Sequence, residues 1–215
     1  MKTKQVYASK RKKHKRLLKY GAVTLAIIIS SILIFTLLFP PSRPYYPNPN
    51  TFYFNAAIVD HLSLTAPNQT FAQTAATILQ NGGFTVDYYS GEKVNVELYR
   101  NLSKHNYGII ILRVHSALAP ENKPPVALFT SELVDINKYK LEILFDQVHG
   151  AGFIPYEEGD PLYFCILPKF VSDCIRETFE NTIIIAMGCN TLTYTDMAEA
   201  FIYKGAKVYI GWSDR

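Results

Sequence analysis

The chain has 215 residues, which is enough for one ordinary domain and a short appendage. Its content of 48% hydrophobic and 13% aromatic residues excludes a disordered chain, because that much apolar surface can offset the chain entropy lost on folding. The net charge of +4 hides two opposite parts: residues 1–20 carry nine lysines and arginines and no acidic residue, whereas the rest holds 13 basic and 18 acidic residues. The rest is therefore mildly acidic, so we expect it to bind no nucleic acid. Three cysteines are too few for a disulfide scaffold, and the folded part must depend on its own core.

Residues 21–39 form a run of nineteen residues without a charge. As a helix rising 1.5 Å per residue, this run would be roughly 28 Å long, close to the hydrocarbon thickness of a bilayer. Pro40 and Pro41 would end that helix. The sequence therefore predicts a basic cytoplasmic tail at 1–20 and a transmembrane helix at 21–39, with the lipid bilayer as a partner. Because positive charges stay on the cytoplasmic side, the remaining chain is expected outside, which makes this a single-pass protein of the cell membrane with an extracytoplasmic domain.

Two alternatives exist for this N-terminal region. The apolar run could be a cleaved secretory signal, but such a core is usually 7–15 residues long and is followed by small residues at the cleavage site, which are missing here. The basic stretch could be a nucleic-acid arm, but beside an apolar span its charges are better explained as holding the orientation of the anchor. The next segment, residues 40–55, contains five prolines and is expected to be a semi-rigid extended stalk.

From residue 56 onward, short apolar runs alternate with helical stretches. We expect strands at 56–60, 84–88, 107–114, 182–187 and 206–212, and helices at 68–81, 95–105, 168–178 and 196–204. Strands that alternate with helices are joined by crossovers, which predicts an α/β fold with a mostly parallel sheet in a three-layer α/β/α sandwich. The stretch 117–161 is less regular, with polar turns and one short strand at 126–130. The last expected strand would normally be followed by a covering helix, so the domain at 56–215 is expected to be truncated at its C-terminal end.

Reactive side chains follow three of the expected strands. Asp60 comes after the first, His115 and Ser116 after the third, and Gly188 and Cys189 after the fourth. Because ligands of an open α/β sheet gather beyond the carboxyl ends of its strands, we expect the histidine and the cysteine to meet in one cleft. The attacking form of cysteine is the thiolate, which a neighbouring imidazole can generate. The pair therefore predicts a catalytic site, although either residue alone is more often structural.

Further roles at this site follow from the same positions. Gly188 is expected to let the chain turn sharply, and the helix after it would direct backbone N–H groups toward Cys189, where they could stabilise a thiolate and an oxyanion. Asp60 and the adjacent His61 could face the same crevice. The Asp60 carboxylate could support the site by orienting His115, or it could cap the following loop.

The order of these elements resembles the caspase–haemoglobinase fold of clan CD cysteine peptidases, and most of all its gingipain-like and CHAT-type branches. The resemblance rests on His115-Ser116, on Gly188-Cys189 and on the helix and strand that lead to 204–212, and it covers roughly residues 56–215. It implies a thiol protease that hydrolyses a peptide or protein substrate, with Cys189 as nucleophile and His115 as base. The resemblance also implies that the backbone N–H groups of Ser116 and Cys189 form the oxyanion hole. The family commonly has glycine where this chain has Ser116, and it continues beyond the last strand into elements that shape the specificity pocket.

The alternative function is a non-catalytic surface module of the same fold, which binds a protein or glycan of the envelope. A flavodoxin-like receiver or ligand-binding domain is a third hypothesis, but the acidic cluster that a phosphorylatable receiver needs is missing. No glycine-rich phosphate loop follows the first strand, and no group of His, Cys, Asp and Glu has metal-ligand spacing. We therefore expect no nucleotide, no metal and no other cofactor.

Modification sites are the last set of candidates. Outside the cytoplasm, Cys165 and Cys174 could form a disulfide and leave Cys189 as the lone free thiol, or both could be free and buried. The triplets that begin at Asn68 and Asn101 match the glycan acceptor pattern, and Asn68 is also a natural helix cap. His149 is expected in a solvated loop.

Overall fold

The computed structural model describes residues 24, 27–31, 33–34, 52–153 and 159–214. The chain divides into two compact units, Met1–Pro44 and Tyr45–Arg215, and the second contains the α/β domain.

Most of the predicted membrane anchor lies outside the described residues. Of the segment 21–39, Thr24, 27–31 and 33–34 are described, and all of them are helical. Ser31 Oγ donates a hydrogen bond to the carbonyl of Ile27 at 2.8 Å, so this hydroxyl is satisfied within its own helix. No helix formed by the described residues is both long and apolar enough to cross a bilayer. The basic tail at 1–20 and the stalk as far as residue 51 also lie outside the described residues, so all three segments stay predictions.

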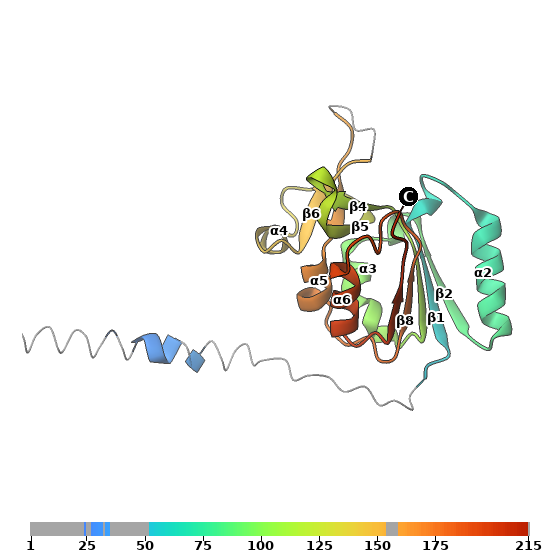
Figure 1. The fold of residues 1–215 in the computed structure, drawn as a ribbon, viewed down its shortest axis with the longest axis horizontal. Coiled ribbons are helices and arrows are strands. Elements are labelled where there is room, and N and C mark those ends of the chain that lie inside the picture. The colour runs from blue at the N-terminus through green and yellow to red at the C-terminus, as the bar shows by residue number, and fades with distance from the viewer. Residues whose placement is uncertain (1–23, 25–26, 32, 35–51, 154–158, 215) are drawn as a thin grey trace, which may run out of the picture. The chain divides into compact units, whose positions relative to one another are not determined.

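A five-stranded parallel sheet, called sheet A here, forms the centre of the domain (Figure 1). Its strands, in spatial order, are β2 (Thr85–Ser90), β1 (Asn55–Asp60), β3 (Ile109–Arg113), β8 (Ile183–Ala186) and β9 (Val208–Ile210). Every pairing in sheet A is parallel, which confirms the predicted α/β class and the predicted parallel sheet. The direction in which strands are added reverses at β1, since β2 lies on one side of it and β3 on the other. Such a switch point opens a crevice at the carboxyl ends of the strands.

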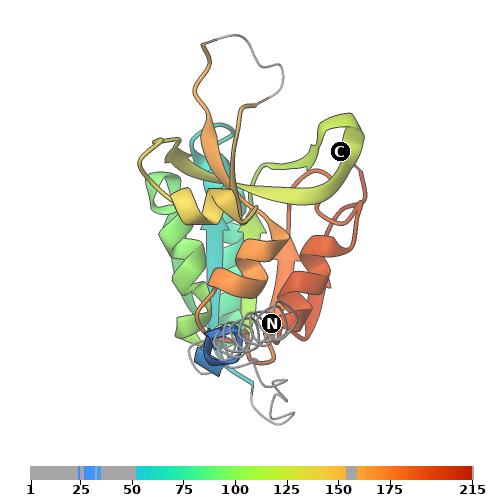
Figure 2. The same ribbon diagram turned by 90° about the vertical axis from the view of Figure 1, so that its left-hand side faces the viewer.

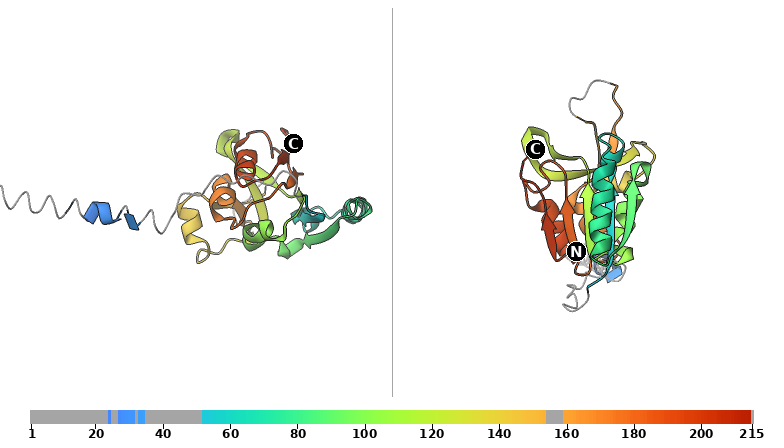
Figure 3. Two further views of the ribbon diagram at one scale, coloured as in Figure 1. Left: turned by 90° about the horizontal axis from the view of Figure 1, so that it is seen from below. Right: turned by 90° about the vertical axis from the view of Figure 1, so that its right-hand side faces the viewer.

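Helices lie on both faces of sheet A (Figures 1 and 3). The helices of the domain are α2 (Gln69–Asn81), α3 (Val96–Asn101), α4 (Lys140–Leu144), α5 (Pro168–Cys174) and α6 (Asp196–Tyr203), with 3₁₀ turns η1 (His61–Ser63), η2 (Gly91–Lys93), η3 (Leu102–His105) and η4 (Pro120–Asn122). Helix α2 covers β1 and β2 on one face, where Ile58 and Leu79 form a small core. Helices α3, α5 and α6 cover the other face, where the larger core lies. On the α2 side, Val208 and Ile210 of β9 are 39% and 46% exposed.

Local capping explains where α2 begins. The Asn68 side chain accepts a hydrogen bond from the backbone N–H of Phe71 at 2.9 Å, so the predicted helix cap is confirmed. Two other helices are shorter than expected. The expected helix at 95–105 consists of α3 followed by the 3₁₀ turn η3, and the one at 168–178 ends at Cys174.

The stretch expected to be irregular contains most of a second sheet, sheet B, which is antiparallel. Its strands, in spatial order, are β4 (Ser116–Ala119), β5 (Lys123–Leu133), β7 (Tyr163–Ile166) and β6 (Val148–Ala151). The short strand expected at 126–130 is the middle of the eleven-residue β5. One face of sheet B, which includes Leu128 and Phe164, packs into the larger core. Sheet B stands beyond the carboxyl ends of the sheet A strands, as Figure 2 shows.

Candidate functional site

The two residues predicted to form the catalytic pair line one cavity. This cavity of about 540 Å³ lies at the carboxyl ends of β3, β8 and β9. Its lining consists of Leu62, Arg113, Val114, His115, Met187, Gly188, Cys189, Trp212, Ser213 and Asp214. The thiol of Cys189 is free and exposed, whereas the side chain of His115 is half-buried. The fold thus brings together residues that are 74 positions apart in the sequence, as the strand order requires.

Gly188 allows the cysteine turn to approach the backbone after β3. A Cβ atom at this position would lie 2.5 Å from the carbonyl oxygen of Val114 and 3.1 Å from the Ser116 hydroxyl. The Ser116 hydroxyl also donates a hydrogen bond to the carbonyl of Cys189. In this turn the residue with a positive φ is Asn190, at 58°. The glycine is therefore required for close approach rather than for the sharp turn expected from the sequence.

The segment after Cys189 is a turn, and a helix begins only at Asp196. The expectation that helical N–H groups point at Cys189 is therefore wrong. Thr191 fixes the turn instead: its buried hydroxyl contacts the carbonyl of Ala186 at 3.1 Å and accepts from the backbone N–H of Trp212 at 3.0 Å.

The segment that follows β9 forms one wall of the cavity. The backbone N–H of Asn190 donates to the carbonyl of Asp214 at 3.1 Å, and that of Leu192 donates to the carbonyl of Trp212 at 2.7 Å. These bonds tie the cysteine turn to residues 212–214, all three of which line the cavity.

The imidazole of His115 is held by a hydroxyl and by aromatic rings. Its Nε2 lies 3.1 Å from Thr65 Oγ1, and its ring centroid lies 4.8 Å from that of Phe153. Burial lowers the pKa of His115, and the positive charge of Arg113 lowers it further. A neutral ring at physiological pH is the form that a general base needs. Among the described residues, the His115 ring and the Cys189 thiol make no direct hydrogen bond to each other.

Asp60 plays neither of the two roles expected of it. The side chain is 1% exposed; its Oδ1 accepts from Arg113 Nη1 at 2.6 Å and its Oδ2 accepts from the Tyr88 hydroxyl at 2.9 Å. It makes no side-chain capping bond to the turn that follows it, and its two oxygens bond groups other than His115. Burial and the bond to Asp60 raise the pKa of Tyr88 to about 12. The carboxylate instead anchors Arg113, whose Nη2 also donates to the carbonyl of Ala66 at 2.6 Å.

The backbone N–H of Ser116 points away from the strand beside it. The carbonyl of His115 accepts a hydrogen bond from the backbone N–H of Phe129, on β5, at 3.0 Å. Since a trans peptide unit is planar, the N–H of Ser116 must point the opposite way, out of the edge of sheet B. The oxyanion roles that the resemblance implies for the N–H groups of Ser116 and Cys189 both stay predictions.

Sequence reasoning placed His61 near the crevice but gave it no function. The side chain is 1% exposed, and its Nδ1 lies 3.4 Å from the backbone nitrogen of His115, from which it accepts a hydrogen bond. Burial lowers the pKa of His61 to about 4, and the neighbouring His115 contributes to this change. The available signal was the position of His61 directly after a buried strand, the same signal that identified His115.

The other candidates lie away from this cavity. Cys165 and Cys174 are both free, and Cys165 is buried whereas Cys174 is half-buried, so the second alternative holds except for the burial of Cys174. The thiol of Cys174, on α5, donates to Gln147 Oε1 at 3.1 Å. Asn101 Nδ2 donates to the carbonyl of Glu97 at 2.8 Å, and Asn68 is exposed as the cap of α2. Glycosylation of these two asparagines stays a prediction.

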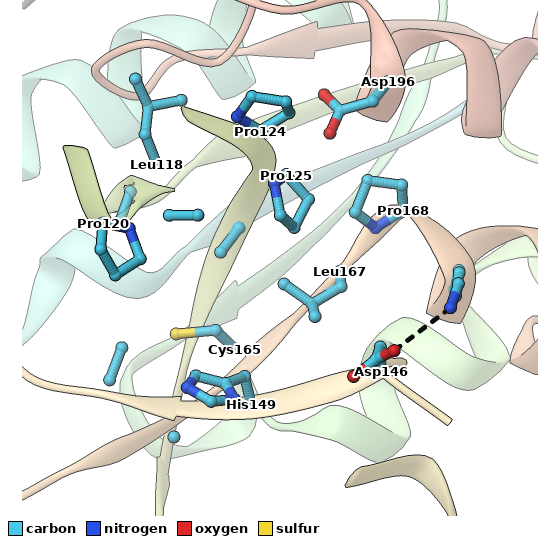
Figure 4. Close-up of a pocket in the computed structure, with 16 residues that line it drawn as sticks. Leu118, Pro120, Pro124, Pro125, Asp146, His149, Cys165, Leu167, Pro168 and Asp196 are labelled. Carbon is cyan, nitrogen blue, oxygen red and sulfur yellow. Dashed lines mark hydrogen bonds and ion pairs between the residues drawn. The ribbon is translucent and has the colours of Figure 1, made fainter. Parts of the chain in front are cut away.

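A second pocket, of about 740 Å³, lies on the outer face of sheet B (Figure 4). His149 lines it from β6 and is exposed, so the expectation of a loop position was wrong. Cys165 faces the same pocket from β7 and is the cross-strand neighbour of His149, which makes a second Cys–His pair. The Cys165 thiol is fully buried, however, and burial raises its pKa, so it stays protonated and is a poor nucleophile.

Small and apolar residues form most of this second pocket. Ala117 and Ala127 line it from β4 and β5, and proline rings form much of its rim. It is therefore suited to apolar groups. Over the described part of the chain, no group of three or more His, Cys, Asp or Glu side chains has an arrangement that could hold a metal ion. Comparisons with protein-family models, with curated proteins and with solved structures give no match to this chain.

Proposed function

We propose that this protein is a membrane-anchored cysteine peptidase that hydrolyses peptide bonds with Cys189 as nucleophile and His115 as base. The observation that carries the proposal is the common cavity that these two side chains line, beyond neighbouring strands of a parallel sheet. The strand order and the helices on both faces are compatible with the caspase-like three-layer sandwich that the sequence resembles. The apolar run at 21–39 and the basic residues before it support the anchor and the extracytoplasmic side of the domain.

The chemistry follows from the groups around the cavity. As Cys189 Sγ attacks the carbonyl carbon of the scissile peptide, its proton passes to the neutral ring of His115. The tetrahedral oxyanion accepts hydrogen bonds from the N–H groups of Ser116 and Cys189. His115 then gives the proton to the leaving amine nitrogen as the C–N bond breaks, which leaves a thioester on Cys189. Water hydrolyses this thioester with His115 again as base, which releases the acid and restores the thiol.

The contacts of His115 decide which ring atom takes the proton. Because Nε2 already contacts the Thr65 hydroxyl, Nδ1 is the ring atom that remains to take the proton in this proposal. Thr65 thus orients the base in the way that a third residue orients the histidine of other nucleophile–base pairs.

Labelling with a peptide that carries a thiol-reactive ketone tests the nucleophile. We expect the full chain to be labelled and the Cys189→Ala variant to lose labelling. Cys174→Ala is the matched control, because it removes another accessible free thiol outside the cavity and should leave labelling intact. His115→Gln should slow labelling by about 10²–10⁴-fold, the usual contribution of a positioned base. Equal labelling of Cys189→Ala and the parent would exclude Cys189 as nucleophile.

A non-catalytic binding module of the same fold is the second candidate. It is favoured by one observation: Nε2 of His115 contacts Thr65, while no hydrogen bond joins the ring to the thiol among the described residues. A binding module would hold the same peptides with equal affinity in the parent and in Cys189→Ala, and neither protein would release a cleaved product. Product analysis by mass spectrometry therefore separates the two candidates.

A further inference from the structure

We propose that His61 is a positioning residue, a buried neutral imidazole that fixes the backbone of His115 and Ser116 and so aligns the base with the oxyanion donor. This inference rests on the proposed function, because it assigns His61 a role in the same reaction.

The ring of His61 is held by a hydrogen bond to the backbone that follows β3. Its Nδ1 accepts from the backbone N–H of His115 at 3.4 Å. Since Nδ1 is the acceptor, the neutral ring must be the tautomer that carries its proton on Nε2. His61 therefore joins the end of β1 to the end of β3.

This bond completes the fixation of the catalytic backbone. His115 has its N–H bound by His61 and its carbonyl bound by the N–H of Phe129 at 3.0 Å. Since the peptide unit between His115 and Ser116 is planar, fixing that carbonyl also fixes the direction of the Ser116 N–H. Loss of the acceptor on His61 frees one of the two anchors, so the backbone of His115 and the imidazole that it carries are held less firmly relative to Ser116.

The surroundings keep the ring of His61 neutral. Its centroid lies 5.5 Å from that of His115, 6.3 Å from that of Phe129 and 6.0 Å from that of Phe153. The titratable groups nearby are His115, whose pKa is also lowered, and the ion pair of Asp60 with Arg113, in which the two charges offset each other. A protonated ring would offer a donor at Nδ1, facing the donor N–H of His115, so the neutral form is the only one that fits this arrangement.

Two substitutions of similar size separate the hydrogen bond from simple packing. In His61→Asn the amide oxygen reaches the position of Nδ1 and can still accept from His115 N–H. In His61→Gln the amide reaches the position of Nε2, so the acceptor for the His115 N–H is lost. His149→Gln, at an exposed histidine outside the cavity, is the control for the chemical change itself.

The first measurement is kcat and KM for a peptide substrate across a range of pH. We expect kcat to fall about 10–100-fold in His61→Gln, the usual effect of losing a partner that orients a catalytic group, with little change in KM. His61→Asn should recover most of that loss. Equal losses in the two variants would mean that His61 only fills space.

The second measurement needs no activity. Amide hydrogen exchange at His115 should accelerate at least tenfold in His61→Gln and stay near the parental rate in His61→Asn. Unchanged exchange at His115 in His61→Gln overturns the inference, whether or not the protein is a peptidase. Accelerated exchange in a protein that releases no product would retain the backbone anchor and refute the proposed function instead.

Discussion

Acid should destabilise this domain through His61. Burial and the neighbouring His115 lower the pKa of His61 from 6.5 to about 4, so the unfolded chain binds a proton at a higher pH than the folded chain does. Above pH 6.5 both states are neutral at this group and stability does not depend on it. As pH falls from 6.5 toward 4, the unfolded state gains protons first, and the free energy of unfolding falls by about 1.36 kcal/mol for each pH unit between the two pKa values, or about 3 kcal/mol in total. Below the folded-state pKa both states are protonated and the loss stops growing.

Denaturant titrations followed by circular dichroism, at intervals from about pH 7.5 to about pH 3.5, measure this loss. His61→Asn is the reference, because asparagine does not titrate and the carboxylates that also respond to acid are common to both proteins. The stability of the parent should decline more steeply than that of the variant between pH 6.5 and 4. The pKa of His115 is lowered in the same direction, and its contribution is present in both proteins. Parallel curves for parent and variant would refute the reasoning, since His61 would then titrate alike in the folded and unfolded chains.

Three further outcomes are expected. Gly188→Ala places a Cβ 2.5 Å from the Val114 carbonyl oxygen, so the turn at Cys189 must move. Both the thermal stability of the protein and the labelling rate of Cys189 should then fall, and an unchanged labelling rate would contradict the close approach. Asp60→Asn leaves Arg113 buried without its counter-charge and should cost about 3–5 kcal/mol in denaturant titration, whereas Glu121→Gln, in the exposed pair with Lys123, should cost about 0–1 kcal/mol. A small thiol reagent at neutral pH should modify exposed Cys189 first, half-buried Cys174 next and Cys165 only on unfolding. Mass spectrometry of digested samples can follow this order, and early modification of Cys165 would contradict its complete burial.

Sheet A was predictable because each of its strands carries its own signal. The runs Ile109–Ile111 and Ile183–Ile185 are β-branched, and a central parallel strand needs apolar side chains on both faces. The alternation with helices then leaves few topologies, because crossovers between parallel strands are right-handed and short. The positions of His115 and Cys189 followed from the strand ends. For this reason the shared cavity could be expected without any structural information.

Only part of β5 was expected in sheet B, because the strands at its two edges have little signal of their own. Strand β4 reads Ser-Ala-Leu-Ala and has no β-branched residue, and β6 reads Val-His-Gly-Ala with one, so neither carries the run of β-branched and aromatic residues that marks a strand. Each is stabilised by the strand beside it, β5 for β4 and β7 for β6. Cross-strand pairing of this kind is a property of two segments together, so a pass along one segment could not reveal it.

The wrong role for Asp60 has a similar cause. Its partner Arg113 lies 53 residues away and becomes its neighbour only because β1 pairs with β3 in register, Asp60 beside Arg113. A carboxylate at a strand end is equally suited to capping and to orienting a histidine, and the sequence holds no signal that selects a buried arginine instead. The expected helix N–H groups at Cys189 are missing because hydroxyl side chains such as Thr191 satisfy the turn after this cysteine, which a helical pattern does not anticipate.

The corrected site changes how the thiol must be activated. No helix N-terminus faces Cys189 within the described residues, since α6 begins seven positions later, and the Arg113 guanidinium is already bound by Asp60 and by the Ala66 carbonyl. The lowered pKa of His115 also disfavours a standing pair of thiolate and imidazolium. In the proposed reaction the proton would therefore leave Cys189 during the attack and not before it, with His115 as a general base. The rate of acylation should rise as pH passes upward through the pKa of His115, below 6.5, and should be slowed in deuterium oxide because a proton moves in that step. A rate that is equal in the two solvents would indicate a preformed thiolate and require a positive group that this arrangement of His115 and Arg113 does not supply.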